Sequence, residues 1–210
     1  MTTSLGDLKW AFFCILKFVV RGPGNKISAQ PNAILISLLK SNIGDMVCLT
    51  PMFRAVKEKY PHCKIYLLCR EKSSEIVKGN PYIDQIIIKI SSAQIIKQLK
   101  NMKIDFACTT NTTVDGVGNL YLSNIPGISA PFYAENEHLH PAMYNLIRKL
   151  VIPIPLYQNG YMPRQCLRLL EPIGIHSTNT QFELYYSKQA GATITDLFIQ
   201  YDINPHSDFI

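Results

Sequence analysis

The stretch ILISLLKSNIGDMVCLTP, residues 34–51, begins as an unbroken apolar run and changes character at Ser41. A run of this kind is typical of a parallel strand that is buried on both faces. From Asp45 onward the pattern predicts a helix. A buried strand followed by a tight turn and a helix is the start of a βαβ unit, so this stretch decides the fold class.

The alternation of strand and helix patterns continues along the chain. The runs that predict strands are residues 33–39, 64–69, 84–90, 104–110 and 128–133. The segments that predict helices are residues 45–60, 72–78, 91–102, 114–124 and 164–172. Strands separated by helices imply right-handed crossovers. We therefore expect an α/β fold with a Rossmann-like, doubly wound and mostly parallel sheet.

Composition limits the classes of function. The chain has 210 residues, of which 47% are hydrophobic and 17% charged, as in a globular protein. Its net charge of +6 favours an anionic partner, but no Lys/Arg block marks a nucleic-acid-binding arm, so nucleic acid is not an expected partner. The six cysteines are irregularly spaced, which predicts reduced thiols in a cytoplasmic protein. His138 and His140 have no pattern that would complete a metal site, so we expect neither a metal nor a cofactor.

The amino terminus has a separate character. Residues 8–20, LKWAFFCILKFVV, are too short to cross a bilayer and lack the cleavage site of a signal peptide. On a helix, Lys9, Lys17 and Arg21 fall within an arc of roughly 120°. Much of the remaining surface is aromatic (Trp10, Phe12, Phe13 and Phe18). We interpret residues 1–31 as an amphipathic helix and a linker, with the helix either in a membrane interface or packed on its own domain.

Asp45 follows the first predicted strand, at the edge where open α/β sheets bind ligands. Two interpretations remain open. Asp is favoured at helix N-termini, where it caps backbone amides. An ionised carboxylate within about 2.6–3.2 Å of a substrate hydroxyl can also act as a general base.

Two common phosphate-binding devices are absent from the sequence. The turn before Asp45 contains one glycine, so it lacks the dinucleotide fingerprint G-x-G-x-x-G, and no P-loop motif occurs. A nicotinamide dehydrogenase or a P-loop NTPase is therefore disfavoured.

Short motifs of the first 84 residues occur in the order and spacing of a known family. They are Ile43-Gly44-Asp45, Thr50-Pro51, Tyr60-Pro61 and Asn80-Pro81-Tyr82-Ile83-Asp84. In this order they resemble the amino-terminal part of glycosyltransferase family 9, the lipopolysaccharide heptosyltransferase-like enzymes. The resemblance implies the amino-terminal half of a two-domain GT-B enzyme. Residues 32–189 would be its acceptor-binding domain, and residues 190–210 an inter-domain segment leading into a strand of a missing donor-binding domain.

The resemblance also implies a function. The enzyme would move a sugar, with inversion, from a nucleotide-sugar donor to a lipopolysaccharide-core or other glycan acceptor, and Asp45 would be the base. The implied acceptor-binding residues are Asn42, Gly44, Arg70, Lys72, Asn111 and Thr112. For Arg70 and Lys72, ordinary solvated charge is the alternative. At Asn111 and Thr112 the chain departs from the Asp-Leu-Gln-Gly that the family often shows.

The donor site would lie in the missing domain, so little transfer is expected from this chain alone. The expected location is the cytoplasm, peripheral on the inner face of the bacterial inner membrane through the N-terminal helix. One alternative is a non-catalytic, membrane-associated module that binds a sugar or phosphosugar. Another is a different Rossmann-like enzyme, which would bind a nucleotide tightly.

Overall fold

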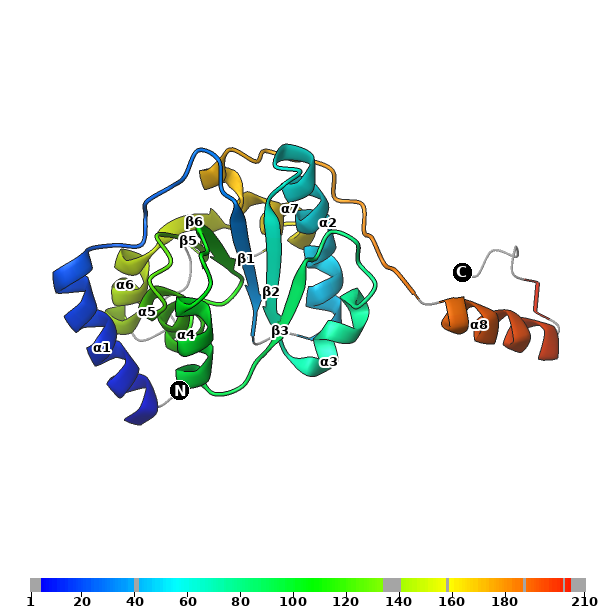
Figure 1. Cartoon of the computed structure of the whole chain (residues 1–210), viewed down its shortest axis with the longest axis horizontal. Coiled ribbons are helices and arrows are strands. Elements are labelled where there is room, and N and C mark those ends of the chain that lie inside the picture. The colour runs from blue at the N-terminus through cyan, green and yellow to red at the C-terminus, as the bar shows by residue number, and fades with distance from the viewer. Residues whose placement is uncertain are drawn as a thin grey trace.

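The structure, a computed structural model, describes residues 5–39, 42–133, 141–157, 159–186, 188–201 and 203–204. Its centre is a six-stranded parallel sheet in the order β3-β2-β1-β4-β5-β6 (Figure 1). The strands are β1 (Ala33–Leu38), β2 (Lys64–Cys69), β3 (Gln85–Ile88), β4 (Phe106–Thr109), β5 (Gly127–Tyr133) and β6 (Ile152–Leu156). This confirms the predicted doubly wound α/β fold. The strand order reverses between β1 and β4, so their carboxyl ends form the topological switch point of the sheet.

Helices cover both faces of the sheet (Figure 1). On one face lie α2 (Ile43–Lys59), α3 (Glu71–Ser74), η1 (Glu75–Val77), α7 (Met162–Arg168) and η2 (Glu171–Ile173). On the other face lie α4 (Ser92–Lys100), α5 (Val114–Leu122) and α6 (Pro141–Leu150). A further helix, α1 (Leu5–Arg21), packs on the outside of α5.

The strand residues divide between two hydrophobic cores. Ile34, Ile36 and Leu38 face the core beneath α2, whereas Leu35 and Leu39 face the core beneath α5. Every residue of β1 is buried. The strand is therefore apolar without alternation, because helices cover the sheet on both sides.

Some elements differ from the sequence-based prediction. The prediction missed α6, and it missed β6 because the sequence IPIPL contains Pro153 and Pro155. Proline cannot donate a ladder hydrogen bond, but β6 is an edge strand, where that loss is tolerated. The helix expected over residues 164–172 ends at Arg168 and is followed by the 3₁₀ turn η2.

Most of the motifs that carry the family resemblance hold the fold together. The hydroxyl of Tyr60 donates to the carbonyl oxygen of Ile173 at 2.6 Å. The Oδ2 atom of Asp84 accepts from Lys57 Nζ and from the Ile65 amide, each at 2.8 Å. These contacts connect α2, β2 and η2, so Tyr60 and Asp84 have structural roles.

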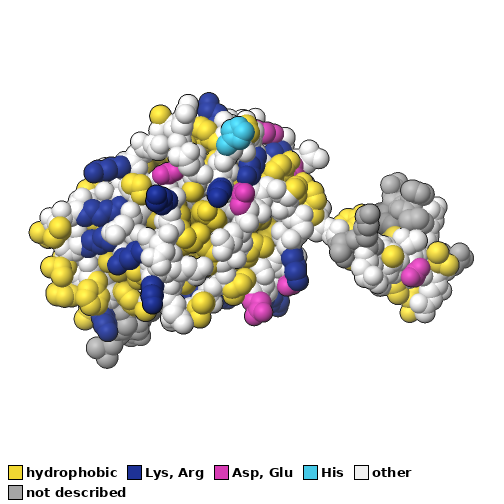
Figure 2. Space-filling model, viewed as in Figure 1, with side chains coloured by type: hydrophobic (Ala, Val, Ile, Leu, Met, Phe, Trp, Pro, Cys, Tyr) yellow, Lys and Arg dark blue, Asp and Glu magenta, His cyan; other side chains and the backbone are white. Residues whose placement is uncertain are grey.

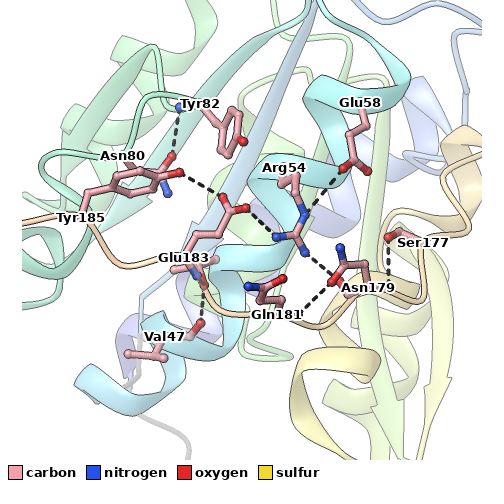
Figure 3. Close-up of polar contacts among 11 residues, drawn as sticks. Val47, Arg54, Glu58, Asn80, Tyr82, Ser177, Asn179, Gln181, Glu183 and Tyr185 are labelled. Atoms are coloured by element: carbon pink, nitrogen blue, oxygen red, sulfur yellow. Dashed lines mark hydrogen bonds and ion pairs between the residues drawn. The ribbon is translucent and has the colours of Figure 1, made fainter. Parts of the chain in front are cut away.

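An extended segment, residues 176–186, crosses α2 and is called the strap here (Figure 3). Arg54 Nη1 contacts Glu183 Oε1 at 2.5 Å, and Arg54 Nη2 donates to the carbonyl oxygen of Asn179 at 3.1 Å. The amide of Glu183 donates to Thr50 Oγ1 at 3.1 Å. The strap is therefore fixed to the middle of α2 by a partly buried ion pair and by hydrogen bonds between its backbone and the side chains of Thr50 and Arg54.

Beyond the strap, α8 (Lys188–Gln200) lies apart from the layers around the sheet (Figure 1). We expected the segment 190–210 to lead into a strand. Residues 190–200 belong to α8, and Asp202 and residues 205–210 lie outside the described part of the chain, so the expected strand stays a prediction. None of the helices described is both long enough and apolar enough to span a membrane.

Candidate functional site

The first turn of α2 places Asp45 at the switch point. Asn42 is the N-cap residue of α2, and its backbone N–H donates to Asp45 Oδ2 at 2.8 Å. Asp45 therefore does serve as a capping residue. Its side chain is half-buried, so capping does not remove the carboxylate from solvent. Both sequence-based interpretations of Asp45 are compatible with this geometry.

Gly44 is exposed in the same turn. A Cβ atom added to Gly44 would meet no other atom within 4 Å, and the backbone there is helical. Packing and backbone conformation therefore do not require glycine at this position. The open space beside it is what a bound ligand would need.

The end of β4 is tied to the end of β1 across the switch point. Asn111 Oδ1 accepts from the Leu39 amide at 3.0 Å, and the Thr110 amide donates to the carbonyl oxygen of Ser37 at 3.2 Å. Gly116 lets α5 approach this loop, since a Cβ there would lie 3.0 Å from the Asn111 Cβ. The side-chain oxygen of Asn111 thus has a structural partner within the protein. The sequence-based prediction assigned Asn111 only to binding of the sugar acceptor.

Two hydroxyls at the switch point are buried without a partner among the described residues. They are Ser37 Oγ, near the end of β1, and Thr110 Oγ1, just after β4. Thr112 follows in the loop and is half-buried. Buried hydroxyls normally find a hydrogen-bond partner, so these groups mark a place where water or a ligand would be favourable. Ser37 and Thr110 were not predicted from the sequence, because a single Ser or Thr residue forms no recognisable pattern.

Cysteines on α2 and α7 lie beside Asp45. Burial raises the pKa of the Cys48 thiol, and the negative charge of Asp45 raises it further. Burial raises the pKa of Cys166 to about 12, with smaller contributions from Cys48 and Asp45. Both thiols are therefore protonated at neutral pH, and neither suits nucleophilic catalysis.

Basic side chains lie on the loops next to the switch point. Arg70 is the N-cap residue of α3, Lys72 lies within α3, and both are exposed. Because β2 runs parallel to β1 and beside it, these residues share the carboxyl edge with Asp45. They sit at the start of a different helix, however, whereas Asn42, Gly44 and Asp45 share one turn.

Lys89, which follows β3, was missed by sequence reasoning. Its Nζ lies 3.8 Å from Asp115 Oδ2 in the first turn of α5, and both side chains are partly buried. This pair places one positive and one negative charge on the carboxyl side of the sheet. Its only sequence signal is a charge at the end of an apolar strand.

A cavity of about 740 Å³ lies at the opposite, amino edge of the sheet. It is lined by Tyr60, Pro61 and His62, by residues 27–32 ahead of β1, and by residues 172–174. It is remote from Asp45, because the amino and carboxyl ends of β1 are at opposite edges. The described residues contain no cluster of three or more His, Cys, Asp or Glu that could hold a metal ion. His138 and His140 lie outside the described residues.

Solved structures share this fold. A glycosyl transferase family 9 protein from Veillonella parvula DSM 2008 superimposes with a TM-score of 0.66 at 13% identity, over 85% of this chain and 52% of that one. The E. coli ADP-heptose LPS heptosyltransferase II gives a TM-score of 0.60 at 14% identity, over 83% and 51%. The E. coli heptosyltransferase WaaC with ADP gives 0.54 at 12%, over 72% and 50%.

The fold is thus shared with about half of these glycosyltransferase structures, in agreement with the motif resemblance. The chain spans about half the length of these solved structures, 50–52% of each. No family model matches the sequence, and no curated protein is significantly similar to it. Short motifs and the fold therefore carry the likeness, whereas overall sequence identity is low.

Proposed function

We propose that this chain is the acceptor-binding half of an inverting, heptosyltransferase-like glycosyltransferase, with a lipopolysaccharide-core or other glycan as acceptor. The observation that carries the proposal is the half-buried carboxylate of Asp45 in the first turn after β1. That turn lies at the switch point, where folds of this type bind their ligands. The likeness in fold to glycosyltransferases supports the same conclusion.

In the proposed reaction, Asp45 accepts the proton of the attacking acceptor hydroxyl. The hydroxyl oxygen bonds to the anomeric carbon of the donor sugar on the face opposite the leaving group. The bond between that carbon and the phosphate oxygen breaks, and the nucleoside diphosphate leaves with the electron pair. The hydrogen bond from Asn42 N–H fixes one oxygen of Asp45, which orients the carboxylate.

The other predicted residues would hold the acceptor. Gly44 would allow a sugar ring to lie close to the backbone, which its open surroundings permit. Thr112 and the Asn42 side chain would offer hydrogen bonds to sugar hydroxyls. The exposed Arg70 and Lys72 would contact acceptor phosphates or carboxylates, for which Arg is suited by its planar fork of donors.

The proposal places the nucleotide-sugar site outside these 210 residues. Stabilisation of the departing phosphate is usually a large part of catalysis, so we expect little turnover by this chain alone. The proposed location is cytoplasmic and peripheral on the inner face of the bacterial inner membrane, where a lipid-anchored acceptor would be reached.

The alternative is a non-catalytic module that binds a sugar or phosphosugar at a membrane. It is favoured by one observation, that Asp45 already has a structural role as a helix cap, because its Oδ2 accepts from the Asn42 amide. In this case the same surface would bind the acceptor, and Asp45 would be only a helix cap.

Two measurements distinguish these possibilities. Calorimetric titration of the chain with a deacylated lipopolysaccharide-core oligosaccharide tests acceptor binding. Nucleotide release from ADP-heptose tests turnover, both with this chain and with any longer product of the same gene. If Asp45 is the base, Asp45→Asn lowers turnover about 10²–10⁴-fold while acceptor affinity stays nearly unchanged. Binding without turnover in every form supports the module, and absence of binding contradicts both.

A further inference from the structure

Two of the three basic residues of α1, Lys17 and Arg21, lie on its inner face. Lys17 Nζ donates to the carbonyl oxygen of Leu122 at 2.8 Å, and Arg21 Nη1 donates to that of Tyr121 at 2.9 Å. Arg21 also donates to the carbonyl oxygen of Ile125. The carbonyls of Tyr121 and Leu122 are at the C-terminal end of α5, where cations complement the helix dipole, and that of Ile125 follows shortly after it. The basic arc seen in the sequence thus faces the domain, apart from Lys9, which is exposed.

The outer face of α1 is apolar and exposed. Ala11 and Cys14 are buried against α5, so the opposite side of the helix faces outward. The exposure of its large apolar side chains runs from 41% for Phe13 to 85% for Val20. They are Leu8, Phe12, Phe13, Ile15, Leu16, Val19 and Val20, and we call them the α1 outer face. A stripe of this size on a folded domain marks an interaction surface.

Exposed cations lie around the α1 outer face, and the described residues of α1, α4 and α6 include few acids. The exposed basic side chains are Lys9 on α1, Lys97 and Lys100 on α4, Lys103, and Arg148 and Lys149 on α6. Neither α4 nor α6 contains an Asp or Glu, and α1 contains one, Asp7. Figure 2 shows hydrophobic side chains along the outer edge of α1, with Lys and Arg side chains beside them.

Lys100 lies close enough to Lys17 to lower its pKa. Burial, followed by the charges of Arg21 and Lys100, lowers the pKa of Lys17 to about 8. The positive charge is thus concentrated along this side of the domain. A second copy placed face to face would bring these cations against one another, which opposes self-association.

We propose that the α1 outer face docks on an anionic lipid bilayer, with α1 lying in the plane of the interface and the surrounding cations near the headgroups. Apolar burial and attraction to anionic lipid then act together, as in other interfacial helices. The helix has 17 residues and is about 25 Å long, which is short for spanning but suits lying flat. The inference rests on this surface alone and does not require sugar transfer.

The test is co-sedimentation of the 210-residue chain with vesicles of phosphatidylcholine containing about 30% phosphatidylglycerol, against pure phosphatidylcholine, at about 0.1 M salt. We expect at least about tenfold stronger binding to the anionic vesicles. Trp10, the single tryptophan, is partly buried against the core of the domain, so its fluorescence reports whether α1 stays packed on the domain when vesicles bind.

Matched variants identify the surface. Phe12→Ser, Leu16→Ser and Val20→Ser together should weaken vesicle binding at least about tenfold. All three side chains are more than half exposed, so the fold should survive, which a thermal melt checks. The control is Ile194→Ser, Leu197→Ser and Ile199→Ser on α8, which are also exposed apolar side chains and should leave binding within about twofold.

Three results would overturn the proposal. One is equal vesicle binding by the wild type and the α1 variant. Another is no binding to either kind of vesicle. The third is a light-scattering result in which the wild type is a dimer and the α1 variant is a monomer. The α1 outer face would then be an interface between copies of the chain.

Discussion

Replacing Gly44 with alanine separates a role in the fold from a role in binding. The added methyl group meets no atom within 4 Å, so it causes no clash. Alanine is favoured over glycine in helices by up to about 1 kcal/mol, so Gly44→Ala should leave the free energy of unfolding unchanged or raise it slightly. If a sugar lies against this turn, the methyl group occupies its space. Crowding of that kind costs about 1–3 kcal/mol, which corresponds to roughly 5- to 150-fold weaker acceptor binding.

The assay combines urea unfolding with calorimetric titration of the core oligosaccharide. Gly79→Ala is the matched control, because a Cβ there makes only ordinary contact, 3.4 Å from the Tyr185 Cβ. Gly79 precedes β3, at the amino edge of the sheet, so its substitution should not change acceptor affinity. A Gly44→Ala variant that is as stable as the wild type and binds the acceptor equally well would refute the proposed contact.

The remaining predictions concern the strap, the pH dependence and the thiols. Arg54→Met should speed hydrogen exchange of the Glu183 amide about 10- to 150-fold, because charge-assisted hydrogen bonds are worth about 1.5–3 kcal/mol. Lys78→Met removes an exposed ion pair and should leave the exchange of this amide unchanged. Burial raises the pKa of Asp84, but hydrogen bonds from Lys57 and the Ile65 amide outweigh it and hold the pKa below its usual value. The stability that Asp84 contributes should thus be present above about pH 4 and be lost as the pH falls through the folded-state pKa. In thermal melts at decreasing pH, the difference in melting temperature between the wild type and Asp84→Asn should therefore shrink. A thiol reagent at pH 8 should label half-buried Cys48 first in the folded chain and all six cysteines after unfolding, and fast labelling of several thiols in the folded chain would contradict the burial.

The strands buried on both faces could be predicted from sequence, whereas β6 could not. The apolar run of β1 has one good structural solution, a central parallel strand covered by helices. The prolines of β6 are acceptable only because the strand is at an edge, which depends on the strand order. Strand order is a property of the whole sheet and is not encoded in any single segment.

The orientation of α1 also needed the structure. Periodicity in the sequence identified a basic side and an apolar side of the helix, but not which of them faces the domain. The cations turn inward because the last carbonyls of α5 accept hydrogen bonds from Lys17 and Arg21. That partnership joins residues about a hundred positions apart and leaves no local signal.

At the candidate site, the sequence predicted the position of Asp45 but not its surroundings. Its place after β1 and its fitness as a helix cap both follow from local pattern. The link between Asn111 and the end of β1, and the unpartnered hydroxyls of Ser37 and Thr110, arise only when β1 and β4 pair. We therefore regard the two hydroxyls and Lys89 as additions to the predicted site.

An amide chemical-shift titration with the core oligosaccharide tests most directly whether the switch point binds a glycan. We predict that the shifted amides cluster at residues 42–46 and 109–113, with smaller changes around residues 70–72. Shifts confined to the amino-edge cavity around Tyr60 and residues 172–174, or no shifts up to about 10 mM ligand, would contradict the proposed acceptor site.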